Sequence, residues 1–446
     1  MLDLFPYQHV GAQFLADRPR AGLFDVPGIG KTAQSVSACD LIGAQRVLVI
    51  CPAAVRTVWP TEFRKFQRIP RRVTAAKKID DLNLWLRGRF DVLVVSYEQA
   101  TRWAPHLQKD LIEAVIIDEA HYIKDAKAKR TKAILGGRCD GTTGIARMGG
   151  AVWFLTGTPH SNSPTDTWTW LRFCGATELS LANYTNTYFN AQPGAFNMSF
   201  SVRKERVEEL RTIIRSNSLR RTKEQVGLQL PPVWLTTQAI EGDDDGIKAL
   251  LRQHPGLDAA ILDAVERGSL SFVDAQHIGT LRRLTGTGKA PAYAAQLIEE
   301  LETDGAKRVV IGIHRAVLDI VAAALEREGI GYVRIDGQVT DSDVREMMVT
   351  QFQLDPKCRV FLGNIKAAGT GLTLTAAYRI DMLEWSWAPA DNAQALMRVH
   401  RIGQTHEVHA RFISLAKSID ERVSATVARK TAAIAAIEGH EEDEAA

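Results

Sequence analysis

The sequence lacks the cysteine pattern of a disulfide-bonded or zinc-binding protein. Its 446 residues include five cysteines, which are far apart in the chain and form no Cys-x-x-Cys pair. A disulfide framework or a zinc site is therefore not expected. We expect buried thiols in a reducing compartment, and so a cytoplasmic protein, for Cys39, Cys51, Cys139, Cys174 and Cys358.

Long apolar runs and a strong charge of one sign are also missing. No run approaches the roughly 18 apolar residues that span a bilayer. The opening stretch "MLDLFPYQHV" lacks the basic and then apolar pattern of a signal peptide, so no membrane association is expected. The formal net charge of +3 does not by itself imply a nucleic-acid partner. At roughly 100–200 residues per domain, the length predicts two or three domains.

Short apolar runs alternate with helical stretches in two parts of the chain. Runs rich in Val and Ile are typical of buried parallel strands. They occupy 46–52, 91–97, 114–120 and 151–159, and then 308–314, 331–337, 359–365, 379–385 and 408–414. With helices between them, this is the βαβ order of a doubly wound sheet. The predicted fold class is α/β, with two parallel sheets.

The stretch between these two parts is polar and largely helical. "LPP" interrupts it at 230–232, and "EGDDDG" forms an acidic loop at 241–246. No hairpin or wedge insertion is evident, although 240–290 leaves room for one. We divide the chain into a first lobe, a helical insertion with linker, a second lobe and an acidic tail, at 1–175, 176–290, 291–430 and 431–446.

A phosphate-binding loop is predicted in "LFDVPGIGKTAQSV". Gly28 and Gly30 let the backbone amides turn towards a phosphate at the start of a helix. Lys31 would reach the β- and γ-phosphates, and the Thr32 hydroxyl would bind magnesium. Asp25 stands where the strict pattern has its first glycine, so this stretch alone leaves a glycine-rich turn as an alternative.

Two acids end a predicted strand in "AVIIDEAHYIK". Asp118 can hold magnesium as the second acid of P-loop enzymes does, and Glu119 can orient or deprotonate the attacking water. A helix-capping acid is the alternative for this stretch alone, but the two stretches together favour a site for ATP and Mg²⁺. Another strand ends in Thr156, Gly157 and Thr158, which form either a γ-phosphate sensor acting through the acids or a polar turn.

The motifs, taken in order, resemble helicases of superfamily 2. They are Gln8, "PGIGKT", "ICPAAVRTVWPTEF", "VVSYEQA", "DEAH", "LTGTPHSN", "LRRTKEQVGLQLPP", "RIDG", "NIKAAGTGLTLT" and "QALMRVHRIGQ". More narrowly, the chain resembles the Swi/Snf-related ATPases from residue 4 to about 425, most specifically in "LRRTKEQV…LPP" and "RVHRIGQ". "ELETDGAKRVVIGIHRAVLD" and "MLEWSWAP", with Glu384, are most similar to the annealing-helicase or HepA-related branch. The resemblance implies two RecA-like lobes with a helical insertion between them.

The resemblance also implies a role for each matching residue. Nucleotide contacts are implied for Gln8, Gly28, Ile29, Gly30, Lys31, Thr32 and Ala33. Magnesium binding is implied for Thr32 and Asp118. A catalytic part is implied for Lys31, Asp118, Glu119, Gln394, Arg398 and Arg401. The two arginines, three apart as on one helix face, would reach the γ-phosphate from the second lobe. Departures from the family pattern are Val26-Pro27 before the loop and Asn364-Ile365 in the fifth motif.

DNA, double-stranded or forked, is the partner that the resemblance implies. Backbone contacts carry no sequence specificity, and they are expected at strand ends, at Pro52, Ala53, Ser96, Tyr97, Gly369, Thr370, Gly371 and Thr373. Basic stretches at 64–72, 124–132 and 219–223 add positive charge or are merely solvated faces. We expect His121 to link the nucleotide site to the Thr156 loop. Five tryptophans are expected to pack the lobes: Trp153, Trp168, Trp170, Trp385 and Trp387.

The expected activity is that of a monomeric DNA-dependent ATPase that moves along double-stranded DNA. One alternative is a helicase that separates strands of DNA or RNA. Another is a clamp that binds nucleic acid under the control of ATP.

Overall fold

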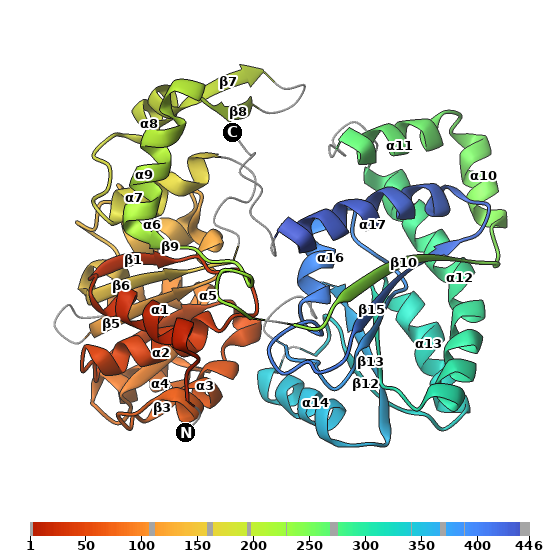
Figure 1. Cartoon of the computed structure of the whole chain (residues 1–446), viewed down its shortest axis with the longest axis horizontal. Coiled ribbons are helices and arrows are strands. Elements are labelled where there is room, and N and C mark those ends of the chain that lie inside the picture. The colour runs from red at the N-terminus through yellow and green to blue at the C-terminus, as the bar shows by residue number, and fades with distance from the viewer. Residues whose placement is uncertain are drawn as a thin grey trace. The chain divides into compact units, whose positions relative to one another are not determined.

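The computed structural model describes residues 3–106, 112–157, 164–193, 198–228, 230–267, 275–339, 341–365, 372–387 and 389–437. The chain divides into two compact units, with unit 1 running to Leu228 and unit 2 beginning at Gln229. Each unit is an α/β sheet flanked by helices (Figure 1). Over the described ranges, no helix combines the length and the apolar character that a bilayer crossing requires.

Unit 1 is built on a seven-stranded sheet of parallel strands, in the order β3-β4-β2-β5-β6-β1-β9. The strands are β1 (Arg20–Leu23), β2 (Val47–Cys51), β3 (Val73–Ala75), β4 (Val92–Ser96), β5 (Ile112–Asp118), β6 (Gly149–Leu155) and β9 (Ser218–Leu219). The four strands predicted from Val- and Ile-rich runs are therefore confirmed. The short strands β1, β3 and β9 were not predicted.

Helices cover both faces of this sheet because its central strands are apolar on both sides. Along β2, Leu48 and Ile50 enter one core while Val47 and Val49 enter the other, as the two-residue period of a strand requires. The second core is covered by α1 (Pro6–Ala16), α2 (Lys31–Leu41) and α3 (Val58–Phe66). The first is covered by α4 (Ile79–Leu86), α5 (Tyr97–Trp103), α6 (Lys129–Leu135), α7 (Trp168–Phe173), α8 (Leu181–Tyr188) and α9 (Val207–Asn217).

Unit 1 also carries an antiparallel pair of strands outside the main sheet. β7 (Phe189–Pro193) pairs with β8 (Met198–Val202), from Phe189 opposite Val202 to Pro193 opposite Met198. No hairpin was evident in the sequence, and this one lies outside 240–290, the range left open for an insertion. Its apolar side chains Phe189, Phe200 and Val202 pack against the first core of unit 1.

Unit 2 is built on a six-stranded parallel sheet in the order β10-β15-β14-β11-β13-β12. Its strands are β10 (Val233–Ile240), β11 (Arg308–Gly312), β12 (Gly331–Ile335), β13 (Cys358–Asn364), β14 (Arg379–Met382) and β15 (Val408–Leu415). One face is covered by α12 (Ala275–Asp304) and α13 (Arg315–Arg327). The other core includes α10 (Asp245–Gln253), α11 (Leu257–Arg267), α14 (Ser342–Leu354), α16 (Pro389–Leu396) and α17 (Ile419–Ile437).

The stretch 176–290, predicted as a helical insertion with linker, is divided between the two units. Its first part, with β9, belongs to unit 1, and its second part, with β10, belongs to unit 2. β10 escaped prediction because it is an edge strand whose side chains alternate between half-buried and exposed positions, with Trp234 53% exposed. The range 240–290, left open for an insertion, contributes α10, α11 and most of α12 to unit 2.

A buried ion network fastens α12 to the sheet of unit 2. Arg411 on β15 bonds to Glu300 through Nη1 at 2.7 Å and to Asp381 through Nε at 2.7 Å. Arg308 on β11 bonds to Glu300 at 2.9 Å, and the Tyr293 hydroxyl donates to Asp381 at 2.8 Å. Each buried charge is thus neutralised by a charged partner, which is the condition for burying charges at all.

Two smaller expectations concern the cores. Buried thiols are confirmed for Cys39, Cys51, Cys139 and Cys358, whereas Cys174 is half-buried. Of the tryptophans expected to pack the lobes, four are at most 6% exposed and Trp387 is partly buried against its core.

Candidate functional site

The predicted phosphate loop lies between β1 and α2 of unit 1. Gly28 and Gly30 have φ angles of 91° and 86°, a region that side chains other than glycine rarely adopt. Gly30 caps the N-terminus of α2, and a Cβ there would lie 2.2 Å from Nε2 of Gln8. The loop therefore exposes backbone amides at a helix N-terminus, which is the arrangement that binds phosphate.

Lys31 is folded back over its own loop. Its ammonium donates to the carbonyl oxygens of Asp25 at 2.6 Å and Val26 at 3.3 Å. Burial lowers the pKa of Lys31, against the opposing effect of the nearby carboxylates of Glu119, Asp25 and Asp118. A triphosphate in the loop would replace weak carbonyl partners with strongly anionic ones.

Asp25, which replaces the first glycine of the strict loop pattern, is fully buried. Arg221, which follows β9, donates to its two oxygens at 3.1 and 2.6 Å. The same guanidinium donates to Oε1 of Gln34 at 2.8 Å and to the carbonyl of Tyr7 at 2.7 Å. Arg221 thus joins the loop, α2 and α1, a role that sequence reasoning missed. The signal was a carboxylate in a glycine position, which needs a cationic partner when it is buried.

The predicted acid pair lies at the carboxyl end of β5. Oδ1 of Asp118 accepts from the Glu119 backbone N–H at 3.0 Å, and Oδ2 accepts from the indole N–H of Trp59 at 3.3 Å. Burial and the neighbouring Glu119 charge raise the pKa of Asp118 to about 7, although Lys31 opposes them. Two crowded carboxylates with a lysine nearby form a site that a cation would stabilise.

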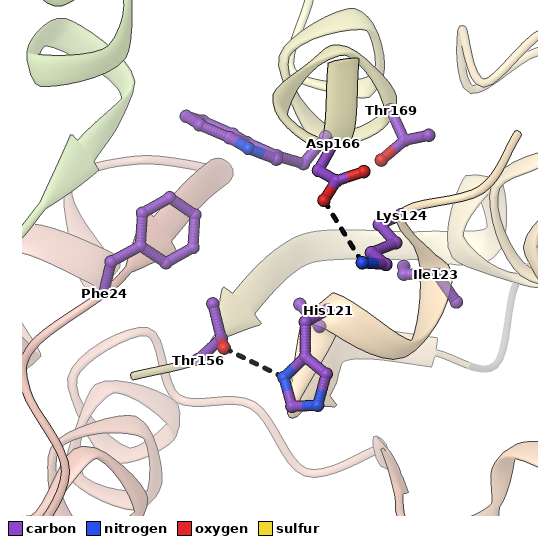
Figure 2. A pocket seen from close by; sticks show the side chains of 9 residues that line it. Phe24, His121, Ile123, Lys124, Thr156, Asp166 and Thr169 are labelled. Carbon is purple, nitrogen blue, oxygen red and sulfur yellow. Dashed lines mark hydrogen bonds and ion pairs between the residues drawn. The ribbon is translucent and has the colours of Figure 1, made fainter. Parts of the chain in front are cut away.

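His121 connects the acid pair to the end of β6, and Figure 2 shows its contact with Thr156. Nδ1 of His121 lies 3.2 Å from Oγ1 of Thr156 and 3.3 Å from Oε2 of Glu119. The predicted link from the acids to the Thr156 loop is therefore confirmed as a contact. His121 and Thr156 line a small cavity of about 10 Å³, roughly the size of one water molecule. The Lys124–Asp166 ion pair, at 3.2 Å, lies beside it. Thr158 lies outside the described residues.

The remaining residues predicted at the nucleotide site are gathered at the same loop. Gln8 is buried and donates to the carbonyl of Ile29 at 3.2 Å, so α1 is fastened to the loop. The side chains of Ile29 and Ala33 are buried, which leaves only their backbone groups for a ligand. Thr32 is half-buried on the first turn of α2. The adenine contact predicted for Gln8 stays a prediction.

The donor set at this loop suits magnesium and a triphosphate. It combines the amides at the N-terminus of α2, the Lys31 ammonium, the Thr32 hydroxyl and the Asp118 carboxylate, each within unit 1. Oxygen donors of this kind are those that Mg²⁺ prefers, together with phosphate oxygens. Asp118 and Thr32 are the residues that would hold the ion.

The strand-end residues predicted to contact DNA are mostly buried. Tyr97 is 1% exposed, and its hydroxyl donates to the carbonyl of Asp118 at 2.6 Å. Ser96 is 4% exposed and caps α5 by accepting from the Gln99 N–H. Pro52 is buried as well, whereas Ala53 is exposed. The Ser96 and Tyr97 side chains thus hold the protein backbone, and the DNA contacts expected at these strand ends stay a prediction. Thr373 is half-buried, and Gly369, Thr370 and Gly371 lie outside the described residues.

The three basic stretches differ in how much charge they expose. In 219–223, Arg220 and Arg221 are committed to carbonyls and to Asp25 around the phosphate loop, so this stretch is not a surface for DNA. In 64–72, Arg71 is buried against Asp40, but four other cations are exposed: Arg64, Lys65, Arg68 and Arg72. In 124–132 the exposed cations are Lys127, Lys129, Arg130 and Lys132.

The last predicted motif lies in unit 2. Gln394 is on α16, but the helix ends at Leu396, before both arginines. Arg398 and Arg401 are half-buried in the turns that follow, so their predicted place on one helix face is wrong. Two hydrogen bonds fix these turns against the segment after 371: Leu374 N–H donates to the Arg398 carbonyl at 2.9 Å, and Arg401 Nη1 donates to the Leu372 carbonyl at 3.2 Å. The action predicted for Gln394, Arg398 and Arg401 on a nucleotide stays a prediction.

A carboxylate organises the carboxyl end of the second sheet. Glu384, just beyond β14, accepts from the backbone N–H groups of Ile313 at 2.7 Å and His314 at 2.8 Å. Its other oxygen lies 2.6 Å from Nδ1 of His314. Asn364, a departure from the family pattern, donates to the carbonyl of Ile313 at 2.6 Å. The sequence marked Glu384 only as a branch feature and gave no sign of this cluster.

Two family models match the chain. The SNF2-related domain matches residues 7–244, and the Helicase conserved C-terminal domain matches residues 292–403. The first covers the phosphate loop, the acid pair and Arg221, and the second covers Gln394, Arg398 and Arg401.

Curated relatives are similar over nearly the whole of this chain. The SWI/SNF-related matrix-associated actin-dependent regulator of chromatin subfamily A-like protein 1 homolog of Caenorhabditis elegans is 28% identical over 429 residues, which cover 94% of this chain and 59% of that protein. The DNA annealing helicase and endonuclease ZRANB3 of Mus musculus is 28% identical over 442 residues, which cover 96% of this chain and 40% of that protein. The chain spans about half the length of the curated relatives it matches.

Among solved structures, the chain is similar to the Sulfolobus solfataricus SWI2/SNF2 ATPase core in complex with dsDNA, at 21% identity and a TM-score of 0.43. The match covers 98% of this chain and 93% of that chain.

Proposed function

Because the chain belongs to the SNF2-related family, we propose that it is a DNA-dependent ATPase that moves along double-stranded or forked DNA. The observation that carries the proposal is the arrangement at one edge of unit 1. There burial lowers the pKa of Lys31, at the start of α2, and the carboxylates of Glu119 and Asp118, at the end of β5, oppose that shift. This is the pairing of phosphate loop and acids that ATP hydrolysis requires.

Each group of this edge has a proposed part in hydrolysis. The amides around Gly28 and Gly30 and the Lys31 ammonium bind the phosphates. Thr32 and Asp118 would hold magnesium, which would supply positive charge beside the phosphates. Glu119 orients the attacking water and accepts its proton, because it is the one acid of the pair that reaches His121 and is 37% exposed.

The second unit supplies the rest of the proposed mechanism. Gln394, Arg398 and Arg401 would act on the γ-phosphate of the nucleotide, where an arginine is worth about 10³–10⁵ in rate in related reactions. If the arginines reach the nucleotide only in one conformation, hydrolysis depends on that conformation and can drive movement. The curated relatives named as annealing helicases support DNA as the track.

DNA would be held through its phosphates and without sequence preference. The exposed cations on and after α3, Arg64, Lys65 and Arg68, are the candidates for this contact in unit 1, together with the exposed Ala53 on the segment before α3. Backbone amides in the segment that ends at Thr373 are the candidates in unit 2. Binding of this kind weakens steeply as the salt concentration rises.

The test is a measurement of ATP hydrolysis with double-stranded DNA, single-stranded DNA, forked DNA and RNA. We expect the largest stimulation with double-stranded or forked DNA, and no hydrolysis by Lys31→Ala with any of them. Stimulation mainly by RNA would contradict the proposal. No stimulation by any nucleic acid would favour a clamp controlled by ATP.

A strand-separating helicase is a second candidate because the β7–β8 hairpin of unit 1 stands outside the main sheet. Displacement of a labelled oligonucleotide from a partial duplex would distinguish it. The proposed motor displaces a third strand from a triplex but leaves the duplex strands paired.

A further inference from the structure

Two buried side chains from outside the phosphate loop hold the acid pair of unit 1. The Trp59 indole N–H donates to Oδ2 of Asp118 at 3.3 Å. The Tyr97 hydroxyl donates to the carbonyl of Asp118 at 2.6 Å and to the carbonyl of Glu119 at 3.2 Å. Neither residue belongs to the nucleotide motifs, and neither was expected at this site.

Both side chains are placed rigidly. Trp59 and Tyr97 are each 1% exposed. The ring of Tyr97 stacks on that of Tyr122, with centroids 5.2 Å apart and planes 10° apart. Burial also raises the pKa of Tyr97 well above its usual value, so its hydroxyl remains a donor. Because they are buried, these two residues act on the reaction through the acids and do not touch a ligand.

The backbone at the acid pair needs such support. Glu119 has φ 52° and ψ 54°, in the left-handed region that costs a residue with a side chain free energy. A residue persists in that region when its surroundings fix it. The Tyr97 hydroxyl bonds to the carbonyls of the two peptide groups that flank the Cα of Glu119, and Trp59 fixes the carboxylate of Asp118.

The same two residues belong to segments expected to face DNA. Trp59 lies on α3, shortly after the short helix Ala53–Val55 and ahead of the exposed Arg64 and Lys65 on the same helix. Tyr97 is the first residue of α5, directly after the strand end at Ser96. A displacement of either segment by a bound backbone therefore moves a group that is hydrogen-bonded to an acid.

We propose that Trp59 and Tyr97 are positioning residues of the Asp118–Glu119 pair and that they couple DNA binding at these two segments to ATP hydrolysis. The coupling rests on the proposed function, whereas the positioning of the acids does not. A hydrogen bond removed next to a metal-binding carboxylate costs about 10–100-fold in metal affinity or activity. We therefore expect about a tenfold effect from each single substitution.

The experiment compares Trp59→Phe and Tyr97→Phe with the unaltered protein. Each substitution removes one donor and keeps an aromatic ring in the core. Trp85→Phe is the matched control, because Trp85 is fully buried in the same unit and its indole N–H donates to the Asp91 carbonyl at 3.1 Å, away from the acids. Thermal unfolding of all three variants shows whether the fold is kept.

Two readouts are measured. The first is kcat and KM for ATP with and without double-stranded DNA. The second is Mn²⁺ affinity in the presence of ADP, followed by electron paramagnetic resonance, which does not depend on turnover. For Trp59→Phe and Tyr97→Phe we expect kcat with DNA to fall about tenfold and KM to change less than about twofold, with DNA affinity kept. We expect Mn²⁺ affinity to fall in Trp59→Phe and all readouts to stay unchanged in Trp85→Phe.

The inference is overturned if both variants keep the kcat and Mn²⁺ affinity of the unaltered protein. The coupling is overturned if DNA stimulates each variant by the same factor as the unaltered protein. A failure of the proposed function looks different, because then no DNA stimulates even the unaltered protein. Basal hydrolysis and Mn²⁺ affinity still decide the positioning of the acids in that case.

Discussion

Replacing Arg221 by methionine is expected to destabilise unit 1 strongly. Its guanidinium is 12% exposed and neutralises the Asp25 carboxylate, which is 0% exposed. Removing one partner of a buried pair leaves an uncompensated charge and costs about 3–5 kcal/mol. For a unit of this size, that free energy corresponds to a fall of about 6–20 °C in the unfolding midpoint.

Thermal unfolding followed by tryptophan fluorescence measures this effect, since most tryptophans lie in unit 1. The double variant Arg221→Met with Asp25→Asn is the first control. It also removes the buried charge, so we expect it to recover much of the lost stability. Arg72→Met is the second control, because Arg72 bonds to Asp91 on the surface with its side chain 58% exposed, where an ion pair contributes little.

The reasoning is refuted if Arg221→Met unfolds at the same temperature as Arg72→Met. It is also refuted if the double variant is less stable than Arg221→Met, because the cost would then come from impaired packing and not from a stranded charge. Weaker ATP binding should accompany the loss of stability, since Asp25 begins the phosphate loop that Lys31 contacts.

Three further predictions concern hydrolysis, acid stability and DNA binding. Arg401→Ala should keep ATP and DNA affinity but lose about 10³-fold or more in kcat, measured by phosphate release. Burial pushes the pKa of Glu300 upwards, but hydrogen bonds from Arg411 and Gln296 outweigh it and hold the pKa below its usual value. A carboxylate whose pKa is lowered by folding stabilises the fold at pH values above its unfolded pKa of about 4.3. This stabilisation is lost as the pH falls through the folded pKa. Glu300→Gln removes this carboxylate, so the stability of unit 2 should fall less steeply at acid pH. Reversing Arg64 and Lys65 to glutamate should weaken binding of any DNA sequence. It should also make log affinity depend less steeply on log salt, by about one unit for each phosphate that the protein no longer touches.

For each of these three predictions, one result would contradict it. Normal hydrolysis by Arg401→Ala would remove unit 2 from the mechanism. A steeper acid transition in Glu300→Gln would mean that the folded carboxylate is protonated more readily than the unfolded one. An unchanged salt dependence after the double reversal would move the DNA contact away from α3.

The buried framework of both units could be predicted from the sequence. Strands such as β2 and β11 consist largely of Val, Leu and Ile residues that are apolar on both faces, and this pattern is typical of strands in the middle of a parallel sheet. The phosphate loop and the acids were predictable for a related reason: Lys31 and Asp118 directly adjoin such strands or helices, so their position follows from the local chain.

Long-range partners could not be predicted. In the sequence, Arg221 is one residue of a basic stretch. Only the fold brings its guanidinium to the carboxylate of Asp25, 196 positions earlier. Tyr97 follows a strand end and so reads as a surface residue, but its hydroxyl bonds to the acid pair. The helix face predicted for Arg398 and Arg401 failed because spacing alone does not show that α16 ends at Leu396.

We propose that this chain converts ATP hydrolysis into movement along double-stranded DNA. Triplex displacement tests it most directly, because a third strand is removed only when a protein moves along the duplex beneath it. We expect ATP-dependent displacement by the unaltered protein and none by Lys31→Ala. Stimulated hydrolysis of ATP on the same duplex without any displacement would contradict it.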